Sequence, residues 1–249
     1  MAEANGKIYD ENFYRSIKDS SYLSALNIAP IVIDLIHPKT MVDIGCGVGT
    51  WTRAFRDLGV DAYGVDGDYV DKSQLMIDEK FFLPWNLENR FDLTQKFDLA
   101  ITIEVAEHLT PARAETFVED LTKSSDVILF SAAISGQGGT NHINEQFQDY
   151  WKKIFEKYGF VAIDYLRPKI WNNDRIGVYH RQNIFFYVRL SELFKYPRLM
   201  KYYLDHQEDQ IMNIVHPVLF IMRTQQFNNA ILRVKELEAE IARLKYTPR

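Results

Sequence analysis

The chain has 249 residues and a formal net charge of −5, and 47% of its residues are hydrophobic. This length predicts one domain of ordinary size with an appendage, and the acidic balance argues against a protein whose main task is to bind nucleic acid. Cys46 is the single cysteine, which excludes an intrachain disulfide framework. Without a signal peptide or an apolar run long enough to span a bilayer, we expect a cytoplasmic protein with no membrane contact.

The N-terminal part, residues 1–37, predicts a helical cap. Two helical patterns cover residues 7–18 and 22–36, and the polar residues 19–21 between them offer N-cap side chains for the second helix. From residue 38 to residue 190, strands alternate with helical stretches, which predicts a domain whose sheet is built from parallel βαβ units. Residues 191–249 predict a helical extension.

A glycine loop follows the first strand of this domain. Residues 41–44 predict a buried strand, and Gly45, Gly47 and Gly49 follow on alternate positions. Glycines let a backbone approach a ligand closely and adopt positive φ. Asp43 precedes them, and its charge would repel a pyrophosphate but suits a ligand with ammonium and sulfonium groups. Position 50 is Thr where a dinucleotide fingerprint needs a third spaced glycine. The loop therefore favours S-adenosylmethionine over NAD and argues against an NAD-dependent oxidoreductase.

The next strand, residues 60–66, ends in Asp66, which lies 17 residues after Gly49. Carboxylates near this offset, roughly 20 residues, accept hydrogen bonds from a ribose in βαβ nucleotide folds. With these motifs in place, the chain resembles the class I S-adenosylmethionine-dependent methyltransferases over residues 20–190. Residues 81–87 resemble the third strand and its adenine-contacting turn, with Asn86 where the family usually has Asp. The fourth and fifth strands of the family are matched by residues 97–109 and 126–131. The closing antiparallel pair is matched by residues 159–165 and 183–189.

The resemblance implies an α/β fold: a Rossmann-like, seven-stranded, mostly parallel sheet with a closing antiparallel strand pair and helices on both faces. It also implies S-adenosylmethionine as the cofactor. The residues that match the cofactor-binding positions are Asp43, Gly45, Cys46, Gly47, Asp66, Gly67, Asn86, Leu87 and Glu104.

A cluster of carboxylates and imidazoles follows the fourth strand. Glu104, Glu107 and His108 have the i, i+3, i+4 spacing that places side chains on one helix face, and His142 lies in the glycine-rich connection 132–145. These four residues are candidate ligands for Mg²⁺, Mn²⁺ or Zn²⁺. The pattern resembles ubiquinone-pathway and small-RNA 2′-O-methyltransferases, in which a metal binds the acceptor hydroxyls. Two alternatives stay open: metal-free catalysis by His142 or His108 as the base beside Glu107, or a structural role.

The C-terminal stretch 220–245 fits a heptad repeat. One core position holds Phe220, Phe227, Val234 and Ile241, and the other holds Arg223, Ala230, Leu237 and Leu244. In a parallel homodimer Arg233 would face Glu238 and Glu240 would face Lys245, which gives complementary flanking charges. The alternative is a single amphipathic helix packed on its own domain.

Together these patterns predict an O-methyltransferase that acts by SN2 transfer on a small hydroxylated acceptor. Residues 136–151 resemble bacterial methyltransferases of surface-glycan and specialised-metabolite pathways, which favours a sugar, a sugar phosphate or a related intermediate. The alternatives are an RNA 2′-O-methyltransferase, which the acidic balance opposes, and a non-catalytic cofactor-binding scaffold that dimerises through its tail.

Overall fold

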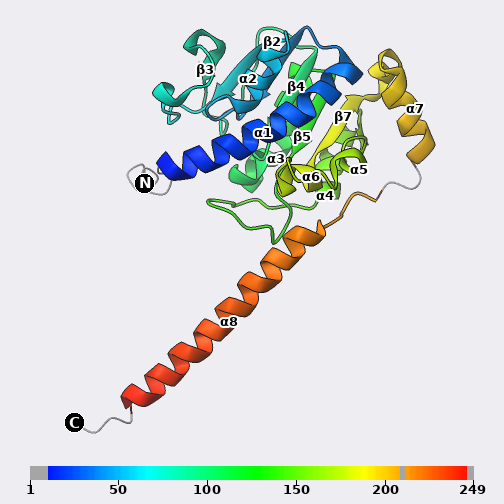
Figure 1. Cartoon of the computed structure of the whole chain (residues 1–249). Helices are drawn as coiled ribbons and strands as arrows, with labels where there is room; N and C mark the ends of the chain where they lie inside the picture. Colours follow the sequence, from blue (N-terminus) through cyan, green and yellow to red (C-terminus); the bar gives the residue numbers. More distant parts are fainter. Residues whose placement is uncertain (1–10, 208–210, 246–249) are drawn as a thin grey trace. The chain divides into compact units, whose positions relative to one another are not determined.

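The computed structural model describes residues 11–207 and 211–245 (Figure 1). The chain divides into two compact units, residues 1–214 and 215–249, and each is described by itself. The predicted boundaries at residues 37 and 190 both fall inside the first unit. Among the helices of the described residues, none combines the length and the apolar character that crossing a membrane requires.

The described residues form a seven-stranded sheet at the centre of the first unit, in the order β3-β2-β1-β4-β5-β7-β6. The strands are β1 (Thr40–Ile44), β2 (Asp61–Asp66), β3 (Phe82–Pro84), β4 (Leu99–Ile103), β5 (Val127–Ser131), β6 (Phe160–Ile163) and β7 (Phe185–Arg189). β7 is antiparallel to both of its neighbours, and the other pairs are parallel. The predicted Rossmann-like, mostly parallel sheet with a closing antiparallel pair is therefore confirmed.

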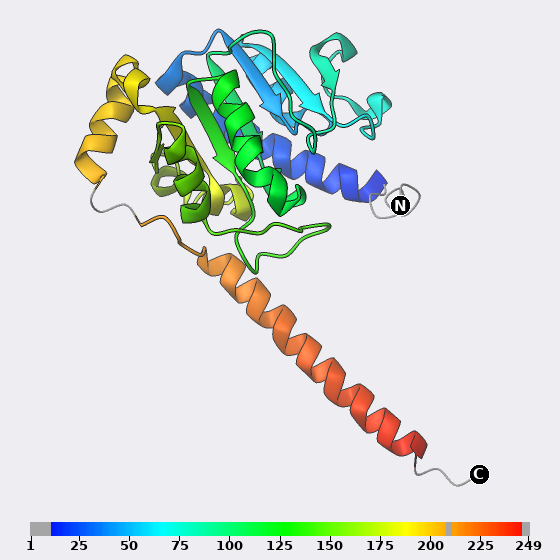
Figure 2. The same cartoon turned by 180° about the vertical axis from the view of Figure 1, so that it is seen from behind.

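Helices cover both faces of this sheet (Figures 1 and 2). α1 (Glu11–Ile36), α2 (Thr50–Asp57) and α7 (Pro197–His206) contribute to one hydrophobic cluster, and α3 (Ala114–Ser124) and α4 (Gln148–Lys157) to the other. The side chains of β5 alternate between them: Val127 and Leu129 belong to the first cluster, Ile128 and Phe130 to the second. This alternation is the period of two that a strand imposes, and it explains why β5 is apolar along its length.

Shorter helical elements connect these parts. Two are α-helices between β6 and β7, namely α5 (Arg167–Ile170) and α6 (Val178–Asn183). The others are 3₁₀ turns: η2 (Lys72–Gln74), η3 (Glu79–Phe81), η4 (Ala106–His108), η5 (Pro111–Arg113) and η6 (Leu190–Lys195).

The prediction of two N-terminal helices with a break at residues 19–21 is wrong. α1 continues without interruption from Glu11 to Ile36, and residues 7–10 of the first predicted helix lie outside the described residues. The Ser21 hydroxyl shares a hydrogen bond of 3.0 Å with Thr50 Oγ1 and accepts one of 3.1 Å from Trp51 Nε1. Ser24 donates to the carbonyl of Ser20 within the same helix. Ser21 therefore holds α1 against α2, and this tertiary bonding overrides its preference for an N-cap.

The carboxyl ends of four neighbouring parallel strands meet at one edge of the sheet. β1 ends at Ile44, β2 at Asp66, β4 at Ile103 and β5 at Ser131. The register aligns them, because Ile103 pairs with Ser131 and Ile44 pairs with Val65. Open α/β sheets bind ligands outside this edge, so the loops that follow these strands hold the candidate site.

The second unit contains α8 (Pro217–Lys245), a single helix of 29 residues. A helix of this length extends for about 43 Å. The predicted helical extension is thus interrupted, since residues 211–216 between α7 and α8 have no helical structure.

Candidate active site

The glycine loop follows β1 and has an open side. Gly45, Gly47 and Gly49 have φ values of 86°, 53° and 82°, a region that favours glycine. A Cβ on Gly45 would lie 2.3 Å from a methyl carbon of Val105, whereas a Cβ on Gly47 would meet nothing within 4 Å. Gly45 therefore packs tightly against the turn after β4, and Gly47 leaves its backbone accessible to a ligand.

Asp66 ends β2 directly beside this open side. Its carboxylate accepts hydrogen bonds from Gly47 N at 2.6 Å, Gly67 N at 2.7 Å and the Tyr69 hydroxyl at 2.5 Å. The two backbone donors fix the carboxylate, while the Tyr69 hydroxyl belongs to a highly exposed side chain. A ribose hydroxyl could take the place of the tyrosine hydroxyl. Sequence reasoning missed Tyr69, because no pattern distinguishes an exposed tyrosine in a loop.

Asp43 lies beneath the loop. It is buried, and its Oδ2 accepts from the backbone N and the hydroxyl of Thr52 in α2, at 3.1 and 2.8 Å. Burial raises the pKa of Asp43 to about 7; the two Thr52 bonds oppose this change and the Asp66 charge adds to it. Asp43 therefore joins β1 to α2, and its predicted contact with the methionine end of a cofactor stays a prediction.

Three further predicted cofactor positions lie near the same loop. Cys46 is buried below it, and burial raises the pKa of its thiol well above the usual range. The turn with Asn86 is attached to the end of β2, because Trp85 N donates to the Asp66 carbonyl at 2.6 Å. Asn86 Oδ1 accepts from Glu88 N within this turn. Leu87 packs with its side chain in the hydrophobic cluster of α3 and α4, so it contributes to the core that supports the turn.

The turn after β4 differs from the prediction. Glu104 has a φ of 55°, in the left-handed region that non-glycine residues seldom adopt, and its N donates to the Ser131 carbonyl at 3.0 Å. The 3₁₀ turn η4 follows, and α3 begins only at Ala114. The expectation that Glu104, Glu107 and His108 share one face of an α-helix is therefore wrong, because the left-handed residue prevents the helix from starting at β4.

The Glu104 carboxylate is held by two buried amides. It accepts from Gln137 Nε2 and from Asn183 Nδ2, both at 3.1 Å, and Asn183 Nδ2 also donates to Gln137 Oε1 at 2.9 Å. Gln137 belongs to the connection after β5 and Asn183 to α6, 33 and 79 residues from Glu104. No local pattern links positions so far apart, and sequence reasoning missed both amides.

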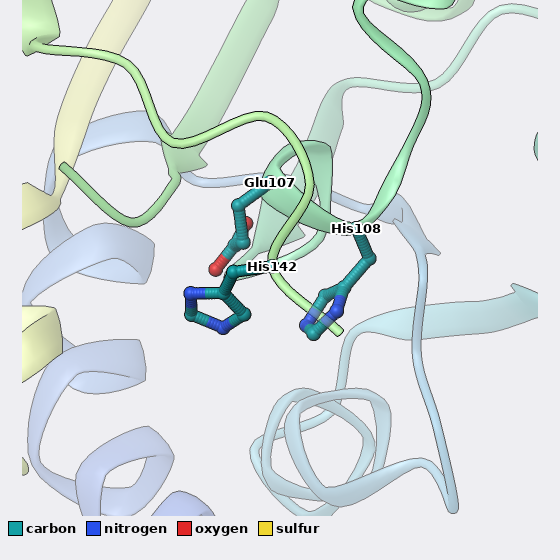
Figure 3. A group of neighbouring side chains, drawn as sticks. All are labelled: Glu107, His108 and His142. Atoms are coloured by element: carbon teal, nitrogen blue, oxygen red, sulfur yellow. The ribbon is translucent and has the colours of Figure 1, made fainter. Parts of the chain in front are cut away.

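Glu107, His108 and His142 come together at this edge of the sheet (Figure 3). Each offers one ligand atom, and these atoms all lie within 4.8 Å of one another. The two imidazole rings meet edge to face, with centroids 4.8 Å apart. The loop with His142 is fixed here because Ile143 N and Asn144 N donate to the Glu107 carbonyl, at 2.9 and 3.0 Å. Glu104, the fourth predicted metal ligand, is not part of this group.

Glu107 is fully buried, yet neither of its carboxylate oxygens has a hydrogen-bond partner among the described residues. Burial raises the pKa of Glu107 well above its usual range, and the neighbouring Glu104 charge adds to this. A buried carboxylate without partners is costly. It requires an explanation, and a missing cation or a bound proton each supplies one.

The two histidines differ in their surroundings. The protein atoms around His108 lower its pKa, and His142 lowers it further, while a backbone hydrogen bond with Asn141 opposes both. His142 Nδ1 lies 2.9 Å from Glu145 Oε1, and its Nε2 lies beside Gly139. A carboxylate behind a ligating histidine is the usual orienting partner in metal sites. The sequence offered only the i, i+3 spacing of His142 and Glu145 as a signal.

Comparison with known proteins identifies the family to which this chain belongs. Residues 22–165 match the model of a methyltransferase domain. The chain is also similar to a ubiquinone biosynthesis O-methyltransferase of Rhodopseudomonas palustris strain BisB18, with 34% identity over 83 residues, or 30% of this chain and 31% of that protein. Its counterpart in strain HaA2 is 31% identical over 111 residues, or 41% of this chain and 37% of that protein. The matches thus cover about a third of these relatives.

Among solved structures, the fold is similar to that of DesVI from Streptomyces venezuelae. The TM-score is 0.54 at 12% identity, and the match covers 74% of this chain and 98% of DesVI. At this identity the likeness concerns the fold alone.

Proposed function

The chain belongs to the methyltransferase-domain family, and we propose that it transfers the methyl group of S-adenosylmethionine to a hydroxyl oxygen of a small acceptor. The open side of Gly47 next to Asp66 supports the cofactor. The names of the matched relatives, which are O-methyltransferases, support oxygen as the acceptor atom.

In this proposal the loop at Gly45, Cys46 and Gly47 lines the methionine end above Asp43. Asp66 and Gly67 meet the ribose hydroxyls, the turn at Asn86 and Leu87 borders the adenine, and Glu104 lies near the transferred group. When bound, S-adenosylmethionine supplies a methyl group activated by its sulfonium. The chain's own contribution is mostly proximity and alignment of the acceptor oxygen with that methyl group, which can lower a barrier by roughly 7–11 kcal/mol.

We further propose that Glu107, His108 and His142 hold a divalent cation. The observation that carries this proposal is the fully buried Glu107 carboxylate, which has no partner and lies beside two imidazoles. Two nitrogen ligands and one oxygen ligand fit Mn²⁺ or Zn²⁺ better than Mg²⁺, which prefers oxygen. When bound, the cation would supply Lewis acidity toward the acceptor hydroxyls.

In the alternative without a cation, a side chain has to accept the proton of the acceptor hydroxyl. His108 suits this role because its lowered pKa keeps the imidazole neutral, and therefore able to accept a proton, at pH 7. His142 is the alternative base, oriented by Glu145. Methyl transfer then forms the carbon–oxygen bond as the carbon–sulfur bond breaks, and S-adenosylhomocysteine leaves.

For the acceptor we propose a sugar, a sugar phosphate or a related hydroxylated intermediate. The support is the polar, glycine-rich connection of residues 132–145 after β5, which lies at the carboxyl edge of the sheet, where open α/β folds bind ligands. The net charge of −5 disfavours an RNA. The 2′-hydroxyl of an RNA is therefore only the alternative acceptor. A non-catalytic cofactor-binding scaffold is the alternative role for the whole chain.

The test is the release of S-adenosylhomocysteine with a panel of nucleotide-sugars, sugar phosphates, catechols and short RNAs, each with and without EDTA. We expect turnover with a sugar class, lost in EDTA and restored by Mn²⁺. His142→Ala should abolish turnover and keep cofactor affinity, whereas His206→Ala, an exposed histidine on α7, should change neither. Turnover that withstands EDTA would reject the metal, and a bound cofactor without turnover on any class would favour the scaffold.

A further inference from the structure

We propose that α8 forms a parallel two-stranded coiled coil with α8 of a second copy of this chain. The contact surface would be the α8 seam, which we define as Phe227, Ala230, Val234, Leu237 and Ile241. These five residues occupy successive core positions of the heptad, three or four residues apart, and all of them are apolar.

The side chains of the α8 seam are exposed on the helix itself. The exposed fractions are 66% for Phe227, 54% for Val234, 41% for Leu237 and 51% for Ile241. A contiguous row of exposed apolar side chains marks an interaction surface in a water-soluble unit. Within the unit of residues 215–249, α8 is a single helix, so this unit by itself offers no second helix to cover the seam.

The spacing of the seam points to another helix as the partner. Phe227, Val234 and Ile241 recur at intervals of seven residues. On a straight helix such a row drifts by about 20° per heptad, and a left-handed supercoil of two helices removes the drift. A helix that lies on a globular domain shows a broader apolar face with a period of 3.6 residues. Ile231 and Leu232 widen the exposed apolar surface at one turn, but the unbroken seven-residue repeat of Phe227, Val234 and Ile241 favours a coiled coil.

The charges beside the seam make the helix complementary to itself. Arg233 and Glu238 occupy the two flanking positions that face each other across a parallel pair. In the single chain Arg233 pairs with Glu236 at 3.0 Å, and both side chains are largely exposed. An exposed ion pair of this kind contributes little, so Arg233 can exchange it for Glu238 of the second copy at small cost.

Arg223 marks the N-terminal limit of the contact. It occupies a core position of the heptad but donates to Gln226 Oε1 at 2.6 Å on its own helix. Two arginines facing each other would repel, which restricts the coiled coil to the stretch that begins at Phe227. The proposal is independent of the methyl-transfer proposal, since it uses no residue of the site in the first unit.

The first test is the mass of the full chain by sedimentation equilibrium. We expect about twice the monomer mass of 29.2 kDa. Val234→Glu and Leu237→Glu should each give a monomer, while Leu232→Glu, the same change at an exposed position outside the seam, should leave the dimer. A monomeric wild-type chain, or a dimer that withstands both seam variants, would overturn the proposal. S-adenosylmethionine affinity, measured on each variant, reports separately on the first unit.

The second test concerns the orientation. Arg233→Glu and Glu238→Arg should each weaken the dimer at least tenfold, and the double variant should restore it, because the reversed charges still face each other in a parallel pair. In an antiparallel pair Arg233 would face Arg233 of the second copy, and Glu238 would face Glu238. Failure of the double variant to restore the dimer would therefore overturn the parallel arrangement.

Discussion

Replacing Glu107 by Gln should stabilise the protein in the absence of metal and weaken its binding of metal. The Glu107 carboxylate is fully buried, has no hydrogen-bond partner among the described residues, and lies close to the Glu104 carboxylate. Gln keeps the shape of the side chain and carries no charge. It therefore removes the electrostatic cost that remains after the backbone N–H groups of Glu107 and Ala133 have partly offset it, and that a cation or a proton would otherwise relieve.

The size of the stability difference between the wild-type protein and the Gln variant follows from the protonation of Glu107. Its pKa in the folded protein is raised well above the ordinary value of 4.5. A group whose pKa is raised by folding contributes its full stabilisation of the folded state at pH values below its ordinary pKa. This stabilisation is lost as the pH rises toward the pKa in the folded protein. Each pH unit corresponds to about 1.4 kcal/mol. Between pH 4.5 and pH 7 the wild-type protein can therefore lose up to about 3 kcal/mol that the Gln variant keeps.

The assay is thermal and urea unfolding in EDTA at several pH values. For a domain of this size, 1 kcal/mol moves the melting temperature by about 2–4 °C. The two proteins should agree near pH 4.5, and the Gln variant should be the more stable one at pH 7. Added Mn²⁺ should reverse the order, because a ligand that binds only the folded state stabilises it.

The matched control is Glu115→Gln, which changes an exposed glutamate that pairs with Lys157 on the surface. Its effect should stay within about 0.5 kcal/mol at every pH. The reasoning is refuted if Glu107→Gln destabilises the protein in EDTA at pH 7, or if the difference from wild type does not depend on pH. Equal stabilisation of both proteins by Mn²⁺ would remove Glu107 from the metal site.

Three further changes test neighbouring parts of the site. Asp66→Ala should weaken S-adenosylmethionine binding at least tenfold, about 1.4 kcal/mol, and an unchanged Kd in a calorimetric titration would contradict the assignment. Gly139→Ala would place a Cβ 2.3 Å from His142 Nε2 and displace this ring. In calorimetric titrations the affinity for Mn²⁺ should therefore fall by roughly 10–100-fold, while the affinity for S-adenosylmethionine should not change. The pKa of Asp43 is raised to about 7, so this group should lower the wild-type free energy of unfolding by up to about 4 kcal/mol as the pH rises from 4 to 7. Urea unfolding of Asp43→Asn should lack this part of the pH dependence.

The architecture was predictable because its signals are local. An apolar strand followed by glycines, and a second strand ending in Asp66, define the first βαβ unit. Parallel strands then bring their carboxyl ends to one edge, where the structure has Asp66 beside Gly47. His142 was predicted to lie near His108, and the two rings do meet. In each case a short pattern and one rule of sheet geometry were sufficient.

The misses have a common physical cause, which is that distant contacts override local preference. At the predicted break in α1, the Ser21 hydroxyl bonds to Thr50 and Trp51 of α2 instead of capping a helix. The helical spacing of Glu104, Glu107 and His108 suggested a helix, yet Glu104 adopts a left-handed conformation that nothing in its sequence neighbourhood requires. That conformation is held by the surrounding structure, as strained residues at functional sites generally are.

Glu104 shows how the two halves of the site depend on each other. Its backbone is fixed to Ser131 of β5, and its carboxylate to the amides of Gln137 and Asn183. The next residue, Val105, packs where a Cβ on Gly45 would lie, so the same short turn supports the glycine loop on one side and Glu107 on the other. Because protein interiors are close-packed and transmit strain, the position of the cofactor loop and the position of the Glu107 cluster are coupled through this turn. In the proposed methyl transfer, the alignment of the acceptor with the cofactor would therefore depend on the carboxyl end of β4, where Glu104 adopts its left-handed conformation.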